Sequence, residues 1–456
     1  SMLHTGRTCA LGLFCALVVL VSSKGSVYVQ TSPSTGVSAK VGRNHPRGSV
    51  VWLFYPLTED SLAERYYEAK PVLLDRKRAG AYFGVLDGLF MSLQSSSFSP
   101  HPRLNHAFPA LRATMMGKDA KPFLFWNKQE IQHAFPPEEI RKNQQEYKPN
   151  QQWDQPALHN THSRGFSTIF LNTHLYDDKV AHPFLKDIAK QLGIFVQMNV
   201  YVTPGKQRGF QTHFDAHDVL VLQLFGRKNW RVYERPAETL PTNDWPYDKI
   251  KPYMKRKEHR KTVIRRTLNQ GDALYIPRGY VHDADCSKLP GDSIHVSVGL
   301  LPPLWGDILY MALETVAAST NKGVLRSKRF PQDFLPLLKA LVKNGYNNTG
   351  FRASPWLPFA VHKIPVQKDR NFNTYKKMVS DFVALPDIRA LRLSTTELEM
   401  EMIKPEVWKN VLERYRDALA AYVNSGRTAG ARYRPVSHNA HEVRHTRPKR
   451  PKRKKV

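Results

Sequence analysis

The spacing of hydrophobic and polar positions changes along the chain. In residues 182–194 ("HPFLKDIAKQLGI") apolar side chains recur every three or four positions, which predicts a helix that ends at the Gly. After it the spacing becomes two, in seven short runs rich in β-branched and aromatic residues and separated by turn residues: 195–204, 217–226, 228–234, 262–269, 272–277, 279–286 and 293–301. Seven strands without intervening helices predict an antiparallel sandwich or barrel of jelly-roll type.

Helical spacing returns after these strands. Residues 305–320, 330–345 and 405–426 predict helices, and the apolar residues of the last one recur at helical spacing, which is typical of a buried face: Trp408, Leu412, Tyr415, Leu419 and Tyr422. Before the strands, residues 50–76 combine a helical pattern with a short strand ending in "PVLL". The expected fold class is mainly β with flanking helices (α+β), a double-stranded β-helix core followed by a helical region.

This pattern divides the chain into six parts. We expect an apolar N-terminus or signal peptide (1–25), a linker (26–49), the β-rich domain with an N-terminal helical extension (50–300), a helical region (301–350), a mainly helical C-terminal region (351–430) and a basic disordered tail (431–456). The polar stretch at 141–165 predicts a long loop or insertion. The apolar helices after the barrel could either mediate dimerisation or pack on their own barrel.

Charge points to an acidic partner but leaves the compartment open. The formal net charge is +29, of which eight positive charges lie in the tail "RHTRPKRPKRKKV". A chain this basic favours RNA, a ribonucleoprotein or an anionic membrane, although a merely solvated basic surface is the plainer interpretation. The tail favours the nucleus or nucleolus. The apolar run "CALGLFCALVVLV" instead resembles a secretory signal peptide, which would place the chain in the secretory pathway.

A metal site built from histidine and carboxylate is the candidate chemistry. Three cysteines, Cys9, Cys15 and Cys286, are too few for a disulfide framework or a cysteine zinc site. His213 and Asp215 are two positions apart, so on a strand both side chains would share one face. A third ligand would come from another strand, with His282 and His295 as candidates. Two histidines and one carboxylate that leave open positions suit non-haem Fe(II), whereas a lone His-x-Asp pair would be an ordinary surface pair.

Several motifs together resemble the JmjC-type, cupin-fold 2-oxoglutarate oxygenases, and among them the ribosomal oxygenases. The resemblance extends over about residues 51–335 and includes "ERYYEAKPVLLDR", "NVYVTPGKQRGFQTHFDAHDVLVLQLFGRKNWRVYE", "GDALYIPRGYVHDADC" and "WGDIL". It implies that residues 50–300 are a catalytic domain in which His213, Asp215 and His282 are the Fe(II) ligands. It also implies 2-oxoglutarate and O2 as co-substrates.

The resemblance assigns further residues to the co-substrate pocket. Lys228 matches the position whose ammonium pairs with the distal carboxylate of 2-oxoglutarate, and a buried point charge suits one carboxylate. Three other positions match pocket-lining side chains: Asn199, Tyr201 and Ser297, the last standing where relatives often carry Thr. His295 resembles a histidine near the co-substrate, and His217 is placed beyond the ligands or at the barrel rim. Gly226 and Trp230 are interpreted as turn and core.

The implied activity is hydroxylation of a protein side chain, histidine or arginine, on a ribosomal protein. The ribosomal partner is consistent with the basic charge, which would also allow contact with RNA, and the family implies a homodimer through helices after the barrel. Three alternatives remain open: demethylation of N-methyl-lysine on histones, hydroxylation of tRNA, and an inactive cupin that only binds. The complete set of ligand residues together with Lys228 argues against the last alternative.

Overall fold

The structure is a computed structural model that separates the chain into two units, residues 1–45 and 46–456. It describes residues 18–21, 27–30, 54, 57–74, 110–114, 125–126, 167–170, 181–207, 212–242, 245, 247–319, 349–355, 370–390 and 394–425. In the first unit, β1 (Val18–Val21) and β2 (Val27–Gln30) form an antiparallel hairpin. The remainder of the predicted apolar N-terminus, the insertion at 141–165, the helix at 330–345 and the basic tail lie outside the described residues.

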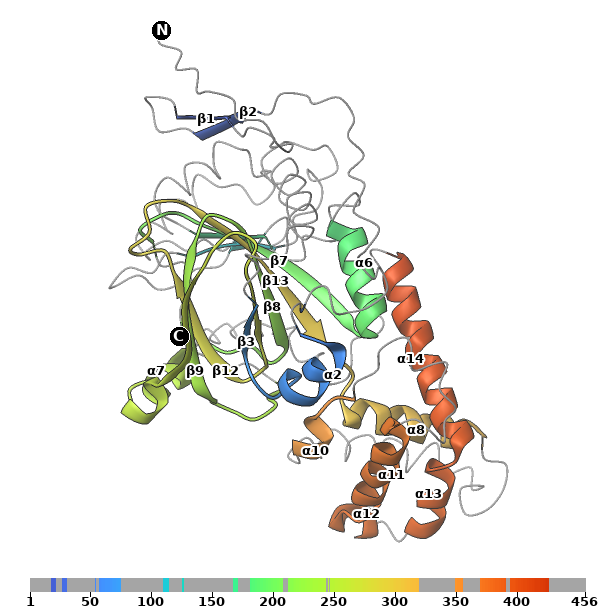
Figure 1. Cartoon of the computed structure of the whole chain (residues 1–456). Helices are drawn as coiled ribbons and strands as arrows, with labels where there is room; N and C mark the ends of the chain where they lie inside the picture. Colours follow the sequence, from blue (N-terminus) through green and yellow to red (C-terminus); the bar gives the residue numbers. More distant parts are fainter. Residues whose placement is uncertain are drawn as a thin grey trace, which may run out of the picture. The chain divides into compact units, whose positions relative to one another are not determined.

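Two antiparallel sheets form the centre of the second unit (Figure 1). The larger sheet contains, in spatial order, β3 (Val72–Leu74), β11 (Ala273–Ile276), β8 (Asp218–Phe225), β13 (Ser293–Leu301), β7 (Phe195–Thr203), β6 (Ser167–Phe170), β4 (Ala110–Thr114) and β5 (Phe125–Trp126). The smaller has the order β10-β9-β12: Thr262–Leu268, Lys228–Pro236 and Tyr280–Asp285. All seven strands predicted from the alternating pattern are present as β7 to β13. The mainly β fold class with a cupin-type core is therefore confirmed. The short strands β4, β5 and β6 were not predicted.

Helices flank the sheets. They are α2 (Glu59–Ser61), a π-helical turn (Leu62–Tyr66), α6 (Ala181–Leu192), α7 (Tyr247–Tyr253), a 3-10 turn (Lys257–Arg260), α8 (Trp305–Ser319), α10 (Thr349–Arg352), α11 (Arg370–Val383), α12 (Pro386–Ala390), α13 (Thr395–Met402) and α14 (Pro405–Ser425). The helix predicted at 182–194 is α6, and Gly193 follows its last residue with φ of 65°, the left-handed conformation that commonly ends a helix. Within the described parts of the chain, no helix is long and apolar enough to span a bilayer.

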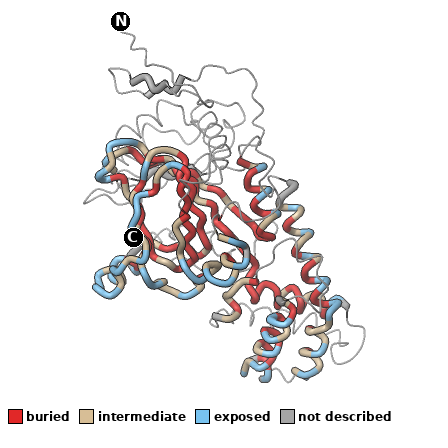
Figure 2. Tube along the Cα trace, in the orientation of Figure 1, coloured by how far each residue is buried: buried red, intermediate tan, exposed pale blue. Residues whose placement is uncertain are grey.

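The main hydrophobic core lies between one face of the larger sheet and the helices (Figure 2). Strand β7 shows how: Val196, Met198, Val200 and Val202 belong to this core, together with buried residues of α6, α8, α11 and α14. The predicted apolar face of α14 is confirmed, because Trp408 is fully buried and the Tyr415 hydroxyl donates a 3.0 Å hydrogen bond to the Gly193 carbonyl at the end of α6. The apolar side chains of α8 are likewise buried within the chain.

A buried polar network joins the segment before β3, the larger sheet and the end of α10. Arg278 forms an ion pair with Glu68 and donates to the Arg352 carbonyl at 2.5 Å. Asp218 accepts a 2.5 Å hydrogen bond from the Tyr275 hydroxyl and a 2.9 Å bond from the backbone N–H of Arg278. Burial raises the pKa of Asp218. Since these groups come from distant parts of the sequence, the network fixes how those segments meet.

Removing one charge from this network should destabilise the fold strongly. Arg278→Met leaves the Glu68 carboxylate buried without its cation, so we expect the free energy of unfolding to fall by about 3–5 kcal/mol in chemical denaturation. Lys261→Met is the matched control, because Lys261 pairs with Glu234 at 2.9 Å on the surface, and such pairs contribute less than about 1 kcal/mol. Equal losses in the two variants would contradict the structural role of Arg278.

Candidate metal centre

Three side chains that can ligate a metal converge where an irregular segment meets β12. His213 and His282 exchange backbone hydrogen bonds, 3.1 Å from the His213 N–H to the His282 carbonyl and 2.7 Å in the reverse direction. The sequence placed His213 and Asp215 on a regular strand, whereas the structure gives His213 a single isolated bridge and starts β8 only at Asp218. The side chains of His213 and Asp215 still point the same way, because the bridge to His282 holds this segment next to β12.

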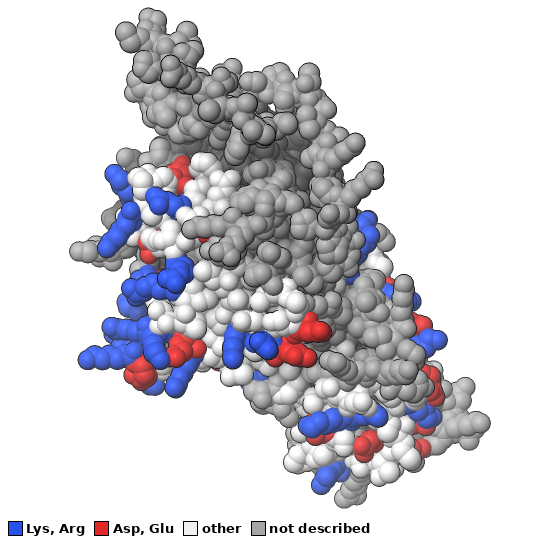
Figure 3. All heavy atoms as spheres, in the orientation of Figure 1, with Lys and Arg blue, Asp and Glu red and all other residues white. Residues whose placement is uncertain are grey.

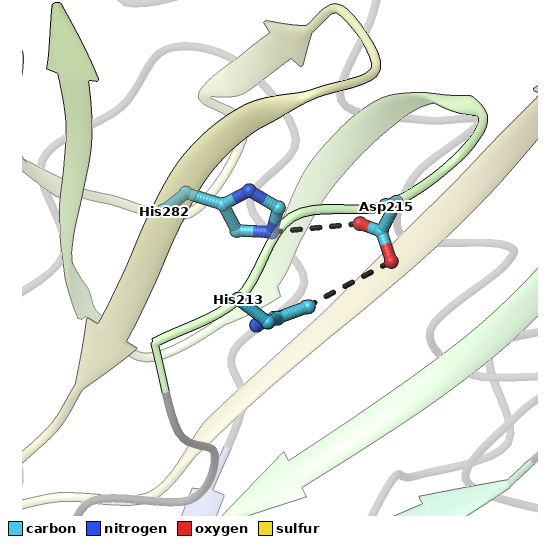
Figure 4. A group of neighbouring side chains, drawn as sticks. All are labelled: His213, Asp215 and His282. Atoms are coloured by element: carbon cyan, nitrogen blue, oxygen red, sulfur yellow. Dashed lines mark ion pairs between the residues drawn. The ribbon is translucent and has the colours of Figure 1, made fainter. Parts of the chain in front are cut away.

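The three donor groups lie close enough to share one ion (Figure 4). The Nε2 atom of His213 is 3.8 Å from one oxygen of Asp215, and the Nε2 atom of His282 is 3.5 Å from the other. One ligand atom from each residue lies within 4.8 Å of the other two. His282 is 6% exposed, while His213 and Asp215 are about a quarter exposed, so one side of the group remains accessible.

Backbone contacts orient the ligands. The Nδ1 atom of His282 lies 3.0 Å from the Tyr280 carbonyl, an acceptor only, so Nδ1 carries the proton and Nε2 keeps its lone pair for a metal. The backbone N–H of Gly279 donates a 3.0 Å hydrogen bond to the Asp215 carbonyl. Gly279 has φ of 84°, and a Cβ there would lie 2.0 Å from the Glu238 carbonyl oxygen, so only glycine fits this turn.

A cavity between the two sheets extends away from these ligands. Strands β7 and β13 pair so that Tyr201 lies opposite His295 and Asn199 opposite Ser297. These four side chains line the cavity, as does His217, while the alternate residues of β7 face the helix-covered core. The structure therefore brings every residue that the sequence assigned to the site into one cavity: Asn199, Tyr201, His213, Asp215, His217, Lys228, His282, His295 and Ser297.

Lys228 provides a buried positive charge in this cavity. Its side chain is 3% exposed, and its Nζ donates a 2.7 Å hydrogen bond to the hydroxyl of the fully buried Thr203. Burial lowers the pKa of Lys228 to about 8. No carboxylate among the described residues lies within ion-pair distance of this ammonium. A buried ammonium without a counter-ion is unfavourable, so the site suits an anionic ligand.

His295 and Trp230 present further polar atoms. His295 stacks on Tyr201 with ring centroids 4.6 Å apart, and Trp230 lies edge-on to His295 at 5.3 Å. Burial, together with the nearby positive charge of Lys228, holds the pKa of His295 well below its usual range, so the ring is neutral. The Nδ1 atom of His295 and the Nε1 atom of Trp230 are buried without a hydrogen-bond partner among the described residues. His295 does not belong to the group of three residues that could hold a metal ion.

The donor set fits a divalent first-row metal with open coordination positions. Two neutral imidazoles and one carboxylate offer one negative charge and leave positions for other ligands, the arrangement used by non-haem Fe(II) oxygenases. The buried ammonium of Lys228 faces the same cavity, and it suits the far carboxylate of a diacid that reaches the metal with its other end. The site can therefore hold a metal and an anionic co-substrate side by side.

Comparison with known proteins agrees with this geometry. Residues 175–311, which include all three candidate ligands and Lys228, match the family model described as JmjC domain. The chain carries a JmjC domain. In the structure, that domain runs from just before α6 to the first half of α8 and so contains both faces of the cavity.

Individual relatives match the chain over segments of different length. The chain is 26% identical to Ribosomal oxygenase 1 of Danio rerio over 307 residues, which cover 65% of this chain and 49% of that protein. It is 35% identical to Ribosomal oxygenase 1 of Homo sapiens over 159 residues, 34% of this chain and 24% of that protein. It is 37% identical over 138 residues to the bifunctional lysine-specific demethylase and histidyl-hydroxylase NO66 of Caenorhabditis elegans, 29% of this chain and 17% of that protein. The chain thus matches less than half of the length of each of these relatives.

The sequence missed two features of the JmjC cavity. Trp230 was interpreted as core, and it is 5% exposed, but it also lines the cavity and lies 6.2 Å from the His282 ring. Thr203, which accepts the hydrogen bond of Lys228, was not singled out at all. Its position on β7, two residues after Tyr201, continues the row of inward-facing polar side chains, and that spacing could have identified it.

Loss of any ligand should abolish tight metal binding. We expect His213→Ala and His282→Ala to weaken Mn²⁺ binding at least about 100-fold in isothermal titration, because each removes one of three protein donors. His217→Ala is the control: His217 lines the same cavity outside the group of three, so its removal should change the affinity less than about threefold. A similar loss in the control would show that the ligand set is wrong.

Proposed function

We propose that this chain is an Fe(II)- and 2-oxoglutarate-dependent oxygenase that hydroxylates a histidine side chain of a ribosomal protein. The observation that carries this proposal is the common cavity of the three candidate ligands and the buried Lys228 ammonium. A bound Fe(II) would activate O2, which is the oxidant: one oxygen atom would end in succinate as 2-oxoglutarate loses CO2, and the other would end in the hydroxyl group of the substrate.

Different residues of the chain would bind the metal, bind the co-substrate and exclude water. His213, Asp215 and His282 would hold the metal, with Nε2 of His282 set by the Tyr280 carbonyl. The ammonium of Lys228, steadied by Thr203, would bind the distal carboxylate of 2-oxoglutarate. The neutral Nδ1 atom of His295 and the Nε1 atom of Trp230 are available for hydrogen bonds to the co-substrate. Val219 and Ala284 form part of the apolar wall that limits water.

The substrate class is proposed from the relatives. Two of them are named as ribosomal oxygenases, and the third is named as a histidyl-hydroxylase as well as a lysine-specific demethylase. Histidine of a ribosomal protein is the substrate that accords with both kinds of name, and a strongly basic chain suits work close to ribosomal RNA. Demethylation of N-methyl-lysine is the second candidate, favoured by the words lysine-specific demethylase in the NO66 name.

Turnover against defined substrate fractions tests the proposal. We expect succinate release to depend on Fe(II), to be stimulated by ribosomal proteins more than by histones or tRNA, and to add the mass of one oxygen atom to a histidine peptide. His213→Ala should abolish turnover and His217→Ala should retain a measurable part. Stimulation by histones with loss of methyl groups would favour the demethylase, and absence of turnover with every fraction would favour a binding module.

Binding of 2-oxoglutarate should weaken as the pH rises through about 8. The pKa of Lys228 is lowered to about 8, so the ammonium that pairs with the carboxylate loses its proton above that pH. Because only the charged form attracts the carboxylate, we expect the apparent Kd to rise about tenfold per pH unit above 8. The Kd for 2-oxoglutarate at each pH can be measured from the quenching of Trp230 fluorescence, with Mn²⁺ bound in place of iron.

Lys228→Arg is the control for this pH dependence, since a guanidinium keeps its charge throughout the range. The Kd of this variant should stay flat between pH 7 and pH 9, whatever its absolute value. A wild-type Kd that is equally flat would contradict the assignment of Lys228 to the carboxylate.

A further inference from the structure

A dense basic surface covers α7, the 3-10 turn after it and β10. Residues 249–266 contain nine Lys and Arg residues and one acidic residue, Glu258. All nine basic side chains are exposed: Lys249, Lys251, Lys255, Arg256, Lys257, Arg260, Lys261, Arg265 and Arg266. In Figure 3, basic side chains gather over the region where Figure 1 draws α7. We call this region the 249–266 surface.

Most of this charge is not neutralised within the fold. Of the nine side chains, Lys261 alone forms an ion pair with a carboxylate, Glu234, among the residues that the structure describes. Arg260 donates to the backbone carbonyls of Met254 and Lys255 at 2.9 Å each, which closes the turn but leaves its charge uncompensated. The fold therefore presents a concentrated positive field to solvent at this place.

The 249–266 surface adjoins the metal-binding segment. Phe214, between two candidate ligands, is buried in a small cluster with Ile250 of α7 and lies 5.4 Å from Trp245, ring centroid to ring centroid. Lys249 in turn places its Nζ 3.6 Å from the centroid of the Trp245 ring. Helix α7 thus packs on the segment that carries His213 and Asp215 and directs basic side chains outward.

The chemistry of the 249–266 surface favours a polyanion over a folded protein or a bilayer. Val263 is the only large apolar side chain of this segment that is described as exposed, at 51%. Stable protein interfaces and membrane insertion both depend on buried apolar area. Closely spaced Lys and Arg residues instead match the regular negative charge of a phosphate backbone.

We propose that the 249–266 surface binds RNA through its phosphates, next to the metal centre. The contacts are electrostatic, so binding is strong at low salt, weak at high salt and tolerant of sequence. It requires neither metal nor 2-oxoglutarate. The surface therefore extends the proposed function from side-chain chemistry to contact with the nucleic acid of a ribonucleoprotein.

The test compares two triple variants of the full chain that remove equal charge. One carries Lys251→Gln, Lys255→Gln and Lys257→Gln on the 249–266 surface. The control carries Lys376→Gln, Lys377→Gln and Lys409→Gln on α11 and α14. Binding of a fluorescent single-stranded RNA of mixed sequence is followed by anisotropy over a series of NaCl concentrations, and unaltered thermal unfolding shows that each variant is folded.

We expect the first variant to lose affinity about tenfold at 0.1 M NaCl and its slope of log K against log salt to shrink by about 2, at roughly 0.7 per lost phosphate contact. The control should keep the wild-type slope. Equal losses in both variants would show that net charge alone matters, and unchanged binding in both would place the RNA elsewhere; either result overturns the proposal.

Two further measurements separate this proposal from its rivals and from the proposed enzyme. Polyglutamate and vesicles rich in phosphatidylserine should bind the wild type more weakly than RNA of matched charge; binding as tight as that of RNA would overturn the assignment. His213→Ala should bind RNA as the wild type does, and the 249–266 variant should retain turnover on a short peptide. Failure of the enzyme assay would therefore leave the result for RNA intact.

Discussion

The pair of backbone hydrogen bonds between His213 and His282 is the constraint on which the site depends. It joins an irregular segment to a strand of the smaller sheet and leaves their imidazole rings 4.4 Å apart, centroid to centroid. Asp215 follows within the same segment, anchored through its carbonyl by the N–H of Gly279. Three donors can then meet one ion, because the backbone and not the side chains alone sets their separation.

The same strands support both the core and the cavity. On β7 the even-numbered residues pack against helices, and the odd-numbered residues from Asn199 onward form a polar row that ends at Thr203, which accepts the hydrogen bond of Lys228. Burial of that polar row is unfavourable unless each group finds a partner. Among the described residues, the Nδ1 atom of His295 has no hydrogen-bond partner and the Lys228 ammonium has no carboxylate within ion-pair distance, so the cavity suits a polar, anionic ligand.

The sequence predicted the local elements well and the long-range polar contacts poorly. Alternating residues identified β7 to β13, and the His-x-Asp spacing identified His213 and Asp215, because each of these signals spans only a few positions. The strand pattern left His282 and His295 open as the third ligand, and the resemblance to the JmjC family selected His282. The ion pair of Glu68 with Arg278 joins positions far apart in the sequence, and no local pattern encodes it. Trp230 was taken for core because a buried aromatic residue is usually core, and only its contact with His295 reveals the cavity wall.

We propose that His213, Asp215 and His282 share one divalent ion. Anomalous diffraction from a crystal soaked in Mn²⁺ tests it most directly. We expect a single strong peak about 2.1 Å from Nε2 of both histidines and from one oxygen of Asp215, on the side that faces the cavity. A peak bound by other residues, or three side chains turned away from any ion at saturating Mn²⁺, would contradict it.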